Sequence, residues 1–505
     1  MSGIRVTYSG LISFVIGIGS IVTGMIFTLI VTRRLTPDEF GEWGLIGALT
    51  GYVLIMIPVI SYWSPREIAR GEKSGKTAFQ SSILFSFGAI LVYLIIAKLI
   101  GLQTELDLEL LFLASIIIPV EFARKSLTNI CLGFKPQGGE YGILVFEFTK
   151  IPVGLILIYF LDMGLAGAII TSALSSLASV IVLMIVARQQ IKEKFDPRYI
   201  KKWLRLSWLP LYPKISTLVS NSDITIFTIL TGSVTGLAYW GVANAVARLV
   251  RHSSKINKAL YPKLLSGGKK EYLEENITHV FYFAFPLAAI SITFSRPTLF
   301  TLNPLYEVAV LVVLVLVPVI FLRTFTAIFT QALQGIERVD INEKATFKDY
   351  LKSKLFFLPT LGNIQRSIYF VSLVILLIIM IPRTESELDL IVYWAIISFI
   401  TQLPFTIYHY FLVKREFHPK FNYKVIIKYL LVTIVVFSII YFIMDEFLIY
   451  KKEIAYFAPR FLVFVVAAIV GYLGITYVID PQIRKLFTAV INELKNLMRQ
   501  KKSVK

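Results

Sequence analysis

The chain has 505 residues, of which 56% are hydrophobic and 16% charged, whereas ordinary soluble domains carry about 25% charged residues. Its mean hydropathy is +0.72. So much apolar sequence excludes a soluble enzyme, a secreted disulfide scaffold and a disordered chain. It predicts an all-α, multi-pass membrane protein whose first partner is the lipid bilayer.

Fourteen apolar segments, most of them near the length needed to cross about 30 Å of hydrocarbon, follow one another along the chain. In chain order they are 9–32, 43–64, 79–101, 108–130, 141–161, 164–187, 208–231, 236–262, 278–300, 306–329, 361–382, 388–413, 425–446 and 457–479. The fourth, eighth and eleventh are the weakest because they contain charged residues. The sequence therefore predicts about 14 transmembrane helices.

The basic residues are distributed unevenly between the two sets of connections. One set, which includes both termini, holds 35 Lys and Arg residues, and the other set holds 7. Because basic residues collect in cytoplasmic loops, both termini are predicted to be cytoplasmic. This distribution accounts for most of the net charge of +19, so no nucleic-acid partner is expected.

The connections are too short for an extramembrane catalytic domain, and this favours a transport protein over an enzyme. The longest internal connection, 330–360, is basic and mixed, and it predicts a cytoplasmic loop with a short surface helix. The tail 481–505 has apolar residues at helical spacing among basic ones. It predicts a basic amphipathic helix on the inner leaflet, with a solvated, frayed tail as the alternative.

Metal and cofactor chemistry has little support in the composition. Cys131 is the single cysteine, and the four histidines are scattered, so no metal-ligand cluster is predicted. No catalytic arrangement stands out on an outer loop, and no cofactor is expected.

An internal repeat relates the two halves at an offset of 197 residues. It aligns Trp43-Gly44 with Trp240-Gly241 and several further identities within 43–71. Six spans separate the copies, and an even number preserves orientation, so the repeats are parallel. The predicted organisation is an N-terminal six-helix lobe at 1–190, a C-terminal six-helix lobe at 191–415, two extra helices within 416–480, and the tail 481–505.

Four cations form the main candidate site. They are Arg248, Arg251, Lys255 and Lys258, at α-helical spacing i, i+3, i+7 and i+10, and their repeat counterparts are Gly51, Leu54, Pro58 and Ser61. The fold therefore does not demand charge at these positions. Such a stripe, which costs free energy in hydrocarbon, can line a cavity that binds a diphosphate, or it can snorkel to the inner interface.

Other charges within the spans extend this candidate set. Arg323 and Arg366 are further candidate substrate-binding residues. Asp223 and Lys214 share the seventh span at a separation that prevents them from pairing, and Asp223 is expected to balance the cations, to bind a coupling cation (proton or sodium), or to form a structural pair. Glu147 and Lys150, at i and i+3, predict a self-neutralising pair.

Several short motifs resemble one protein family. The stretch Arg33-Arg-Leu-Thr-Pro-Asp-Glu-Phe-Gly41 resembles the R-x-L-x-P-x-x-F-G signature of Wzx-like polysaccharide flippases, in the multidrug/oligosaccharidyl-lipid/polysaccharide exporter superfamily. Asn221-Ser-Asp223 with Gly236-Leu-Ala-Tyr-Trp-Gly, Ala332-Leu-Gln-Gly335 and Gly164-Leu-Ala-Gly-Ala168 resemble further family motifs. The resemblance implies that the chain moves a polyprenyl-diphosphate-linked oligosaccharide between leaflets by alternating access.

Two other functions stay open at this point. A drug/cation antiporter of the same superfamily favours an acidic, aromatic cavity, whereas the stripe here is basic. A membrane glycan polymerase or ligase usually needs a sizeable outer loop, and the longest outer connection, 447–460, is short.

Overall fold

The computed structural model describes residues 6–104, 106–259, 270–337, 339, 347–384, 386–485 and 487–488. Over these residues the chain forms helices and no strand. Nine described helices are long and apolar enough to cross a membrane, or ten if a bent pair counts as one span. The predicted all-α, multi-pass architecture is confirmed, and the number fourteen stays a prediction.

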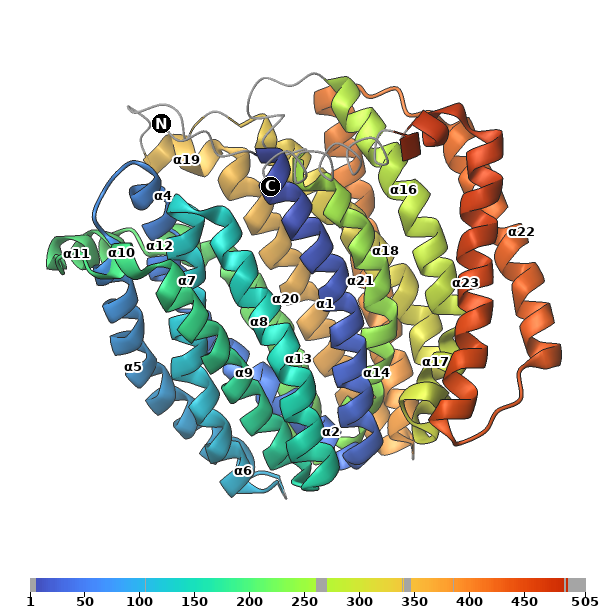
Figure 1. Cartoon of the computed structure of the whole chain (residues 1–505), viewed down its shortest axis with the longest axis horizontal. Coiled ribbons are helices and arrows are strands. Elements are labelled where there is room, and N and C mark those ends of the chain that lie inside the picture. The colour runs from blue at the N-terminus through green and yellow to red at the C-terminus, as the bar shows by residue number, and fades with distance from the viewer. Residues whose placement is uncertain are drawn as a thin grey trace, which may run out of the picture. The chain divides into compact units, whose positions relative to one another are not determined.

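Every predicted span overlaps one or more helices (Figure 1). The first half contains α1 (Val6–Arg34), α2 (Pro37–Leu54), α3 (Pro58–Ser61), α4 (Ser64–Ala69), α5 (Gly75–Gly101), α6 (Leu108–Leu113), η1 (Ala114–Ile116), α7 (Ile117–Phe134), α8 (Pro136–Gly154), η2 (Leu155–Phe160) and α9 (Gly164–Val186). The connection between the halves contains α10 (Arg188–Ile191), α11 (Pro197–Arg205) and α12 (Trp208–Leu211). The second half contains η3 (Tyr212–Lys214), α13 (Ile215–Thr231), α14 (Thr235–Ala247), η4 (Arg248–Ala259), α16 (Lys270–Thr293), α17 (Ser295–Leu302), η5 (Pro304–Ala309), α18 (Val310–Gly335), α19 (Phe347–Lys352), α20 (Lys354–Met380), η6 (Ile381–Arg383), α21 (Glu387–Phe417), α22 (Tyr423–Phe447) and α23 (Ile454–Ile479).

On several helices small residues are buried and large apolar residues are exposed. Leu91 of α5 is 64% exposed and Phe442 of α22 is 71% exposed, whereas Ser175 and Ser179 of α9 are buried. Ser179 donates a hydrogen bond to the carbonyl oxygen of Gly142 on α8 (2.8 Å). This pattern is expected in lipid, where helices associate through small residues and hydrogen bonds because hydrocarbon already solvates large apolar side chains.

The signature residues before and within α2 have local structural roles. Thr36 and Glu39 form a capping box, in which the Thr36 hydroxyl accepts from the Glu39 N–H (3.2 Å) and the Glu39 carboxylate accepts from the Thr36 N–H (2.8 Å). Pro37, at the first helical position, already has a helical φ. At Gly41 a Cβ would lie 1.9 Å from the carbonyl oxygen of Val234. These residues start the helix and allow a close backbone approach.

The second predicted span is broken in its middle. The chain bends by 48° between Pro37–Leu54 and Pro58–Ala69. The N–H groups of Met56 and Ile57 bond to carbonyls three residues earlier, which is 3₁₀-type bonding. The equivalent positions in the second repeat lie within η4, which is a 3₁₀ helix over Arg248–Ala259. The departures from α-helical bonding therefore overlap in the two copies, although the second begins at Arg248, whose counterpart Gly51 still lies in α2.

Equivalent positions of the two repeats contact each other. Asp38 and Thr235 are related by the offset of 197, and the Thr235 hydroxyl donates to the Asp38 carboxylate. Gly241, the counterpart of Gly44, packs against the ring of Phe40. Such contacts are expected close to an axis that relates two repeats, so they support the internal repeat.

By contacts, the chain divides into unit 1, Met1–Val242 with Leu355–Ile397, and unit 2, Ala243–Lys354 with Ser398–Lys505. In unit 1, α7 packs against α5, α8 and α9, and α13 packs against α2 (Figure 1). In unit 2, α16 packs against α18, α22 and α23. These units group helices by contact rather than by repeat, and the lobe boundaries predicted from the sequence stay a prediction.

The two C-terminal helices are joined to α16 by buried tyrosines. The Tyr472 hydroxyl donates to the carbonyl oxygen of Tyr282 (2.7 Å). Asp480, just past α23, accepts from the Lys428 ammonium (2.6 Å) and the Tyr429 hydroxyl (2.9 Å). Burial raises the pKa of Asp480, but its hydrogen bonds outweigh this effect, and the net shift is downward. The carboxylate therefore stays ionised and holds the end of α23 against α22.

Helix α11 is fixed to the turn between α4 and α5. The buried Trp203 donates through its indole N–H to Glu67 (3.1 Å), and the Lys202 ammonium lies 2.8 Å from the same carboxylate. The Tyr199 hydroxyl donates to Glu72 (2.7 Å). This hydrogen bond, together with burial, raises the pKa of Tyr199 to about 12. The connection between the halves is thereby anchored to unit 1.

Two predicted surface elements lie partly outside the described residues. Within 330–360 the structure contains the short helix α19, as predicted, while residues 338 and 340–346 are outside the described part. Of the tail, residues 486 and 489–505 are also outside it, so the amphipathic tail helix stays a prediction.

Candidate functional site

A buried carboxylate, Asp223, lies within α13 of unit 1 and takes part in a hydrogen-bond network with side chains of two other helices. The Tyr369 hydroxyl of α20 donates to Oδ2 of Asp223 (2.7 Å), and the Trp394 indole N–H of α21 donates to the Tyr369 oxygen (2.5 Å). Asp223 is 9% exposed, and both aromatic side chains are fully buried. Because a buried carboxylate requires hydrogen-bond donors, this network fixes its position.

Aromatic rings pack around the hydrogen-bond network of Asp223. Trp394 stacks on Trp240 of α14, with ring centroids 4.0 Å apart, and on Phe227 of α13, at 5.3 Å. Gly236 permits this packing, since a Cβ there would lie 2.8 Å from the Phe227 ring. The N–H of Gly236 donates to Glu387 at the start of α21 (2.6 Å). Four helices thus form one acidic, aromatic cluster. Of its residues, only Asp223 was predicted from the sequence.

Two predicted residues lie in the same unit as this cluster. Arg366 is on α20, and its guanidinium lies 6.0 Å from the ring centroid of Tyr369. Lys214 immediately precedes α13, is exposed, and forms no ion pair with Asp223. The structure therefore brings Arg366, and not Lys214, towards the Asp223 cluster.

The Glu147–Lys150 pair on α8 has the predicted arrangement. The Lys150 ammonium lies 2.5 Å from the Glu147 carboxylate, and both side chains are largely buried. The Thr23 hydroxyl of α1 donates to the same carboxylate (2.5 Å). The ammonium also lies 5.3 Å from the ring centroid of Phe146 and 5.5 Å from that of Phe27. The prediction of a self-neutralising pair is confirmed.

A second charge group, on α7, was not singled out from the sequence. Arg124 binds Glu121 through two hydrogen bonds, of 2.9 and 2.8 Å, and Ser176 of α9 also donates to Glu121 (2.7 Å). Lys125, the next residue, has no hydrogen bond or ion pair from its side chain to the described residues. The sequence did contain a signal for this group. Glu121 is followed by cations at i+3 and i+4, and one carboxylate can neutralise only one of them.

The predicted arginine pair lies on η4 of unit 2. Arg248 and Arg251 are both exposed on the unit, and the Arg248 side chain donates to Asn244 (3.2 Å). In a 3₁₀ helix, which has 3.0 residues per turn, side chains at i and i+3 eclipse. The two arginines therefore share one face of η4.

The lysines of the predicted stripe are placed differently. Lys255 and Lys258 follow Arg248 by seven and ten residues, so in 3₁₀ geometry their positions are turned by about 120° from the arginine face. The side chains of both lysines lie outside the described residues. Arg323 is half-buried on α18 of the same unit.

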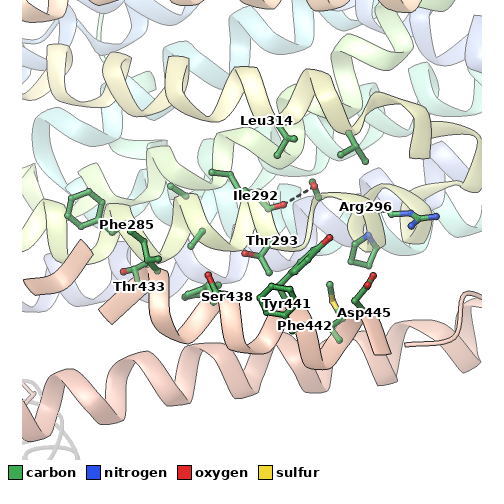
Figure 2. Close-up of a pocket in the computed structure, with 18 of the residues that line it drawn as sticks. Phe285, Ile292, Thr293, Arg296, Leu314, Thr433, Ser438, Tyr441, Phe442 and Asp445 are labelled. Carbon is green, nitrogen blue, oxygen red and sulfur yellow. Dashed lines mark hydrogen bonds between the residues drawn. The ribbon is translucent and has the colours of Figure 1, made fainter. Parts of the chain in front are cut away.

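A pocket of about 600 Å³ lies within unit 2, between the α16–α17 junction, the start of α18 and α22 (Figure 2). Phe285, Ile292, Leu314 and Phe442 contribute apolar walls, and Arg296 lies at one end. None of the predicted site residues lines this pocket.

The described residues offer no cluster of three or more His, Cys, Asp or Glu side chains placed to hold a metal ion.

Comparison with known proteins identifies the fold. No family model matches the chain, and no curated protein matches it. Among solved structures, the lipid II flippase MurJ in an inward closed conformation matches with a TM-score of 0.62 at 14% identity, covering 94% of this chain and all of that one. An inward-facing multidrug resistance MATE family transporter of the MOP superfamily matches with a TM-score of 0.59 at 14% identity, covering 78% of this chain and 95% of that one. The chain is a multi-pass membrane protein with the fold that these two proteins share.

Proposed function

We propose that this protein is a flippase that moves a polyprenyl-diphosphate-linked oligosaccharide from the cytoplasmic to the outer leaflet by alternating access. The observation that carries the proposal is the pair Arg248 and Arg251. They occupy repeat positions at which the first copy has Gly51 and Leu54, which are uncharged and lie at the end of α2.

The chemistry of the arginine pair fits a phosphorylated lipid. A guanidinium binds phosphate oxygens through two hydrogen bonds, and two guanidinium groups on one face match a diphosphate. The likeness in fold to a protein described as a lipid II flippase supports the same substrate class. Such a lipid is used to build surface polysaccharide or other cell-surface glycans, which places the protein in the plasma membrane in this proposal.

The test is the double variant R248Q/R251Q, compared with R248K/R251K and with R383Q, which changes an exposed arginine in the predicted outer connection after α20. We expect correct insertion of the Gln variant and accumulation of lipid-linked sugar on the cytoplasmic leaflet. The Lys variant should keep part of the activity, since lysine keeps the positive charge but lacks the planar guanidinium that donates two hydrogen bonds to a phosphate. Transport by the Gln variant at the wild-type rate would contradict the proposal.

Asp223 is proposed as the group that couples transport to a cation, a proton or sodium. The carboxylate is buried among aromatic rings, where a bound cation gains more from its charge than it would in water. The D223N variant should insert normally but transport poorly, and its residual activity should no longer respond to pH or sodium. Wild-type activity of D223N under all these conditions would exclude the coupling role.

A second candidate function is export of organic cations. The acidic, aromatic cluster of Asp223, Tyr369, Trp394 and Trp240 suits such a substrate through charge and cation–π attraction, and one solved structure of this fold is described as a multidrug resistance transporter. Cells that express the protein would then export cationic dyes, and D223N would abolish export while R248Q/R251Q would not. The opposite pattern favours the flippase.

Membrane orientation is proposed from the basic residues, with both termini cytoplasmic. After replacement of the buried Cys131, cysteines at the exposed positions 73 and 386 report the two sides. In intact cells S386C should react with an impermeant thiol reagent, and K73C should not. The reverse result would invert the topology.

A further inference from the structure

The connection between the two halves of the chain carries an excess of positive charge. Residues 188–205 contain seven Lys and Arg residues and two acidic residues. Both acids already bind other groups of the protein: Glu193 accepts from a backbone N–H at the start of α5, and Asp196 caps α11. The acids of this segment therefore balance only a part of its basic charge.

The four cations of α11 have different surroundings. Arg198 is 2.7 Å from Asp196, and Lys202 is 2.8 Å from Glu67. Lys201 and Arg205 are exposed and form no ion pair with any residue that the structure describes. Like charges at i and i+4 destabilise a helix. An anionic partner outside the protein would therefore stabilise this one.

The segment is fixed at the Gly75 end of α5. Helix α10 packs against α5 and α9, and α11 packs against α3 and α5. The N–H of Asp196 donates to the Thr77 hydroxyl (2.9 Å), and the N–H of Gly75 donates to Glu193 (3.4 Å). Because α5 and α9 are among the helices long and apolar enough to span a membrane, α10 and α11 lie where membrane spans end.

The orientation of α11 suits the plane of the lipid head groups. Figure 1 shows α10 and α11 running crosswise to α5 and reaching beyond it on the left. An amphipathic helix in this position lies in the boundary between head groups and acyl chains. The exposed residues of α11 therefore decide whether it contacts lipid or water.

Three pairs of residues at i and i+4 form three stripes along α11, and neighbouring stripes are about 100° apart. They are Tyr199 with Trp203, Ile200 with Leu204, and Lys201 with Arg205. Trp203 is buried against the unit, whereas Leu204 is 49% exposed. Phe195 and Trp208, which flank the helix, are also exposed. An exposed apolar stripe beside a basic one, with aromatic residues nearby, is typical of helices that bind anionic membrane surfaces.

We propose that α11 is a binding surface for anionic phospholipids, in which Lys201 and Arg205 bind the head-group phosphates and Leu204 enters the acyl-chain boundary. The leaflet is the one at the Gly75 end of α5, which is cytoplasmic in the proposed topology. The inference does not rest on the flippase proposal, because it concerns the lipid around the protein and not the lipid that is moved.

A dye at position 204 reports which lipids approach α11. The full-length protein, with Cys131 replaced and L204C labelled with bimane, is placed in nanodiscs that contain phosphatidylcholine and phosphatidylglycerol. In matched samples one lipid or the other carries brominated acyl chains, which quench the dye on contact. Brominated phosphatidylglycerol should quench more strongly than brominated phosphatidylcholine at the same mole fraction, and added salt should reduce the difference.

Two paired variants assign this preference to the basic stripe. K201Q/R205Q should lower the relative affinity for phosphatidylglycerol by about fivefold for each cation removed, and K201R/R205K should keep it. The control K98Q/R383Q removes two exposed cations that the proposed topology assigns to the other side, and it should behave as the wild type. In phosphatidylcholine alone, K201Q/R205Q should melt as the wild type does, because the contact of Trp203 with Glu67 is kept.

Four results would overturn the inference. Absence of quenching by either lipid would place α11 in water. Equal quenching by the two lipids in the wild type would leave an apolar contact without head-group recognition. An undiminished preference in K201Q/R205Q would remove Lys201 and Arg205 from the surface. A melting temperature of K201Q/R205Q far below that of the wild type in phosphatidylcholine would show that these cations hold the fold. None of these results would affect the flippase proposal.

Discussion

The two repeats can be compared where their second helices begin and where those helices break. In the first copy, α2 starts with a capping box at Thr36 and Glu39, and α-helical bonding stops after Leu54. In the second copy, α14 starts at Thr235, and η4 takes over at Arg248. The two breaks overlap, with the second starting four repeat positions earlier, and only the second copy carries arginines at the positions of Gly51 and Leu54.

This difference separates what the fold requires from what it permits. The close approach of Gly41 to Val234 and the contact between Asp38 and Thr235 involve the starts of both helices, so these residues belong to the architecture. Arg248 and Arg251 have uncharged counterparts in a copy that breaks in the same region. We infer that they were added to a common framework, and the predictions below test this distinction.

The largest effect is expected at Gly41. A Cβ there would lie 1.9 Å from a backbone carbonyl oxygen, so the G41A variant must move α2 away from the segment before α14. We expect a loss of about 3 kcal/mol of stability, measured by equilibrium unfolding in mixed micelles. G44A is the matched control, since no atom lies within 4 Å of a Cβ at that position. Equal stability of the two variants would remove Gly41 from the shared framework.

A smaller effect, on binding rather than on folding, is expected when Arg251 receives the residue of its counterpart, Leu54. R251L should insert and unfold as the wild type does, because the first copy shows that the framework accepts leucine. Its affinity for farnesyl diphosphate should fall about tenfold, which corresponds to loss of one charge-assisted contact. Unfolding at a markedly lower temperature, with binding unchanged, would make Arg251 part of the fold.

Much of the helical architecture could be predicted from the sequence because membrane helices satisfy their backbone locally. All fourteen predicted spans overlap helices. Glu147 and Lys150 were equally accessible, since a pair at i and i+3 needs only its own helix. The repeat offset also predicted which positions correspond, and the contact between Asp38 and Thr235 adds support that sequence identity alone could not give.

The candidate site was harder to predict, for two physical reasons. The hydroxyl that donates to Asp223 belongs to Tyr369, more than a hundred residues further along the chain, and Trp394 in turn donates to Tyr369. No local pattern marks such contacts. The four cations were placed on one face by α-helical spacing, whereas Arg248–Ala259 is a 3₁₀ helix, and their role in binding stays a prediction. The lack of an ion-pair partner for Lys125 could have been predicted, because the sequence places one carboxylate, Glu121, beside two cations.

A modest loss of stability is expected from removal of the cap of α2. T36A loses the hydroxyl that accepts the Glu39 N–H, and loss of an N-cap of this kind costs about 1 kcal/mol. T36S keeps the acceptor and should unfold as the wild type does. If T36A and T36S are equally stable, the capping box does not contribute to the start of the first copy.

The smallest effect tests the contact between equivalent positions. The Thr235 hydroxyl donates to Asp38 in a partly exposed setting, so T235V should cost only about 0.5 kcal/mol. Because D38N removes the charge of the acceptor, the two changes share one interaction and should not be additive. A double-mutant cycle of T235V and D38N is expected to give a coupling energy of about 0.5 kcal/mol. A coupling energy of zero, with each single variant folded, would mean that Thr235 and Asp38 do not interact, and the close approach of the two helix starts would then rest on Gly41 and Val234 alone.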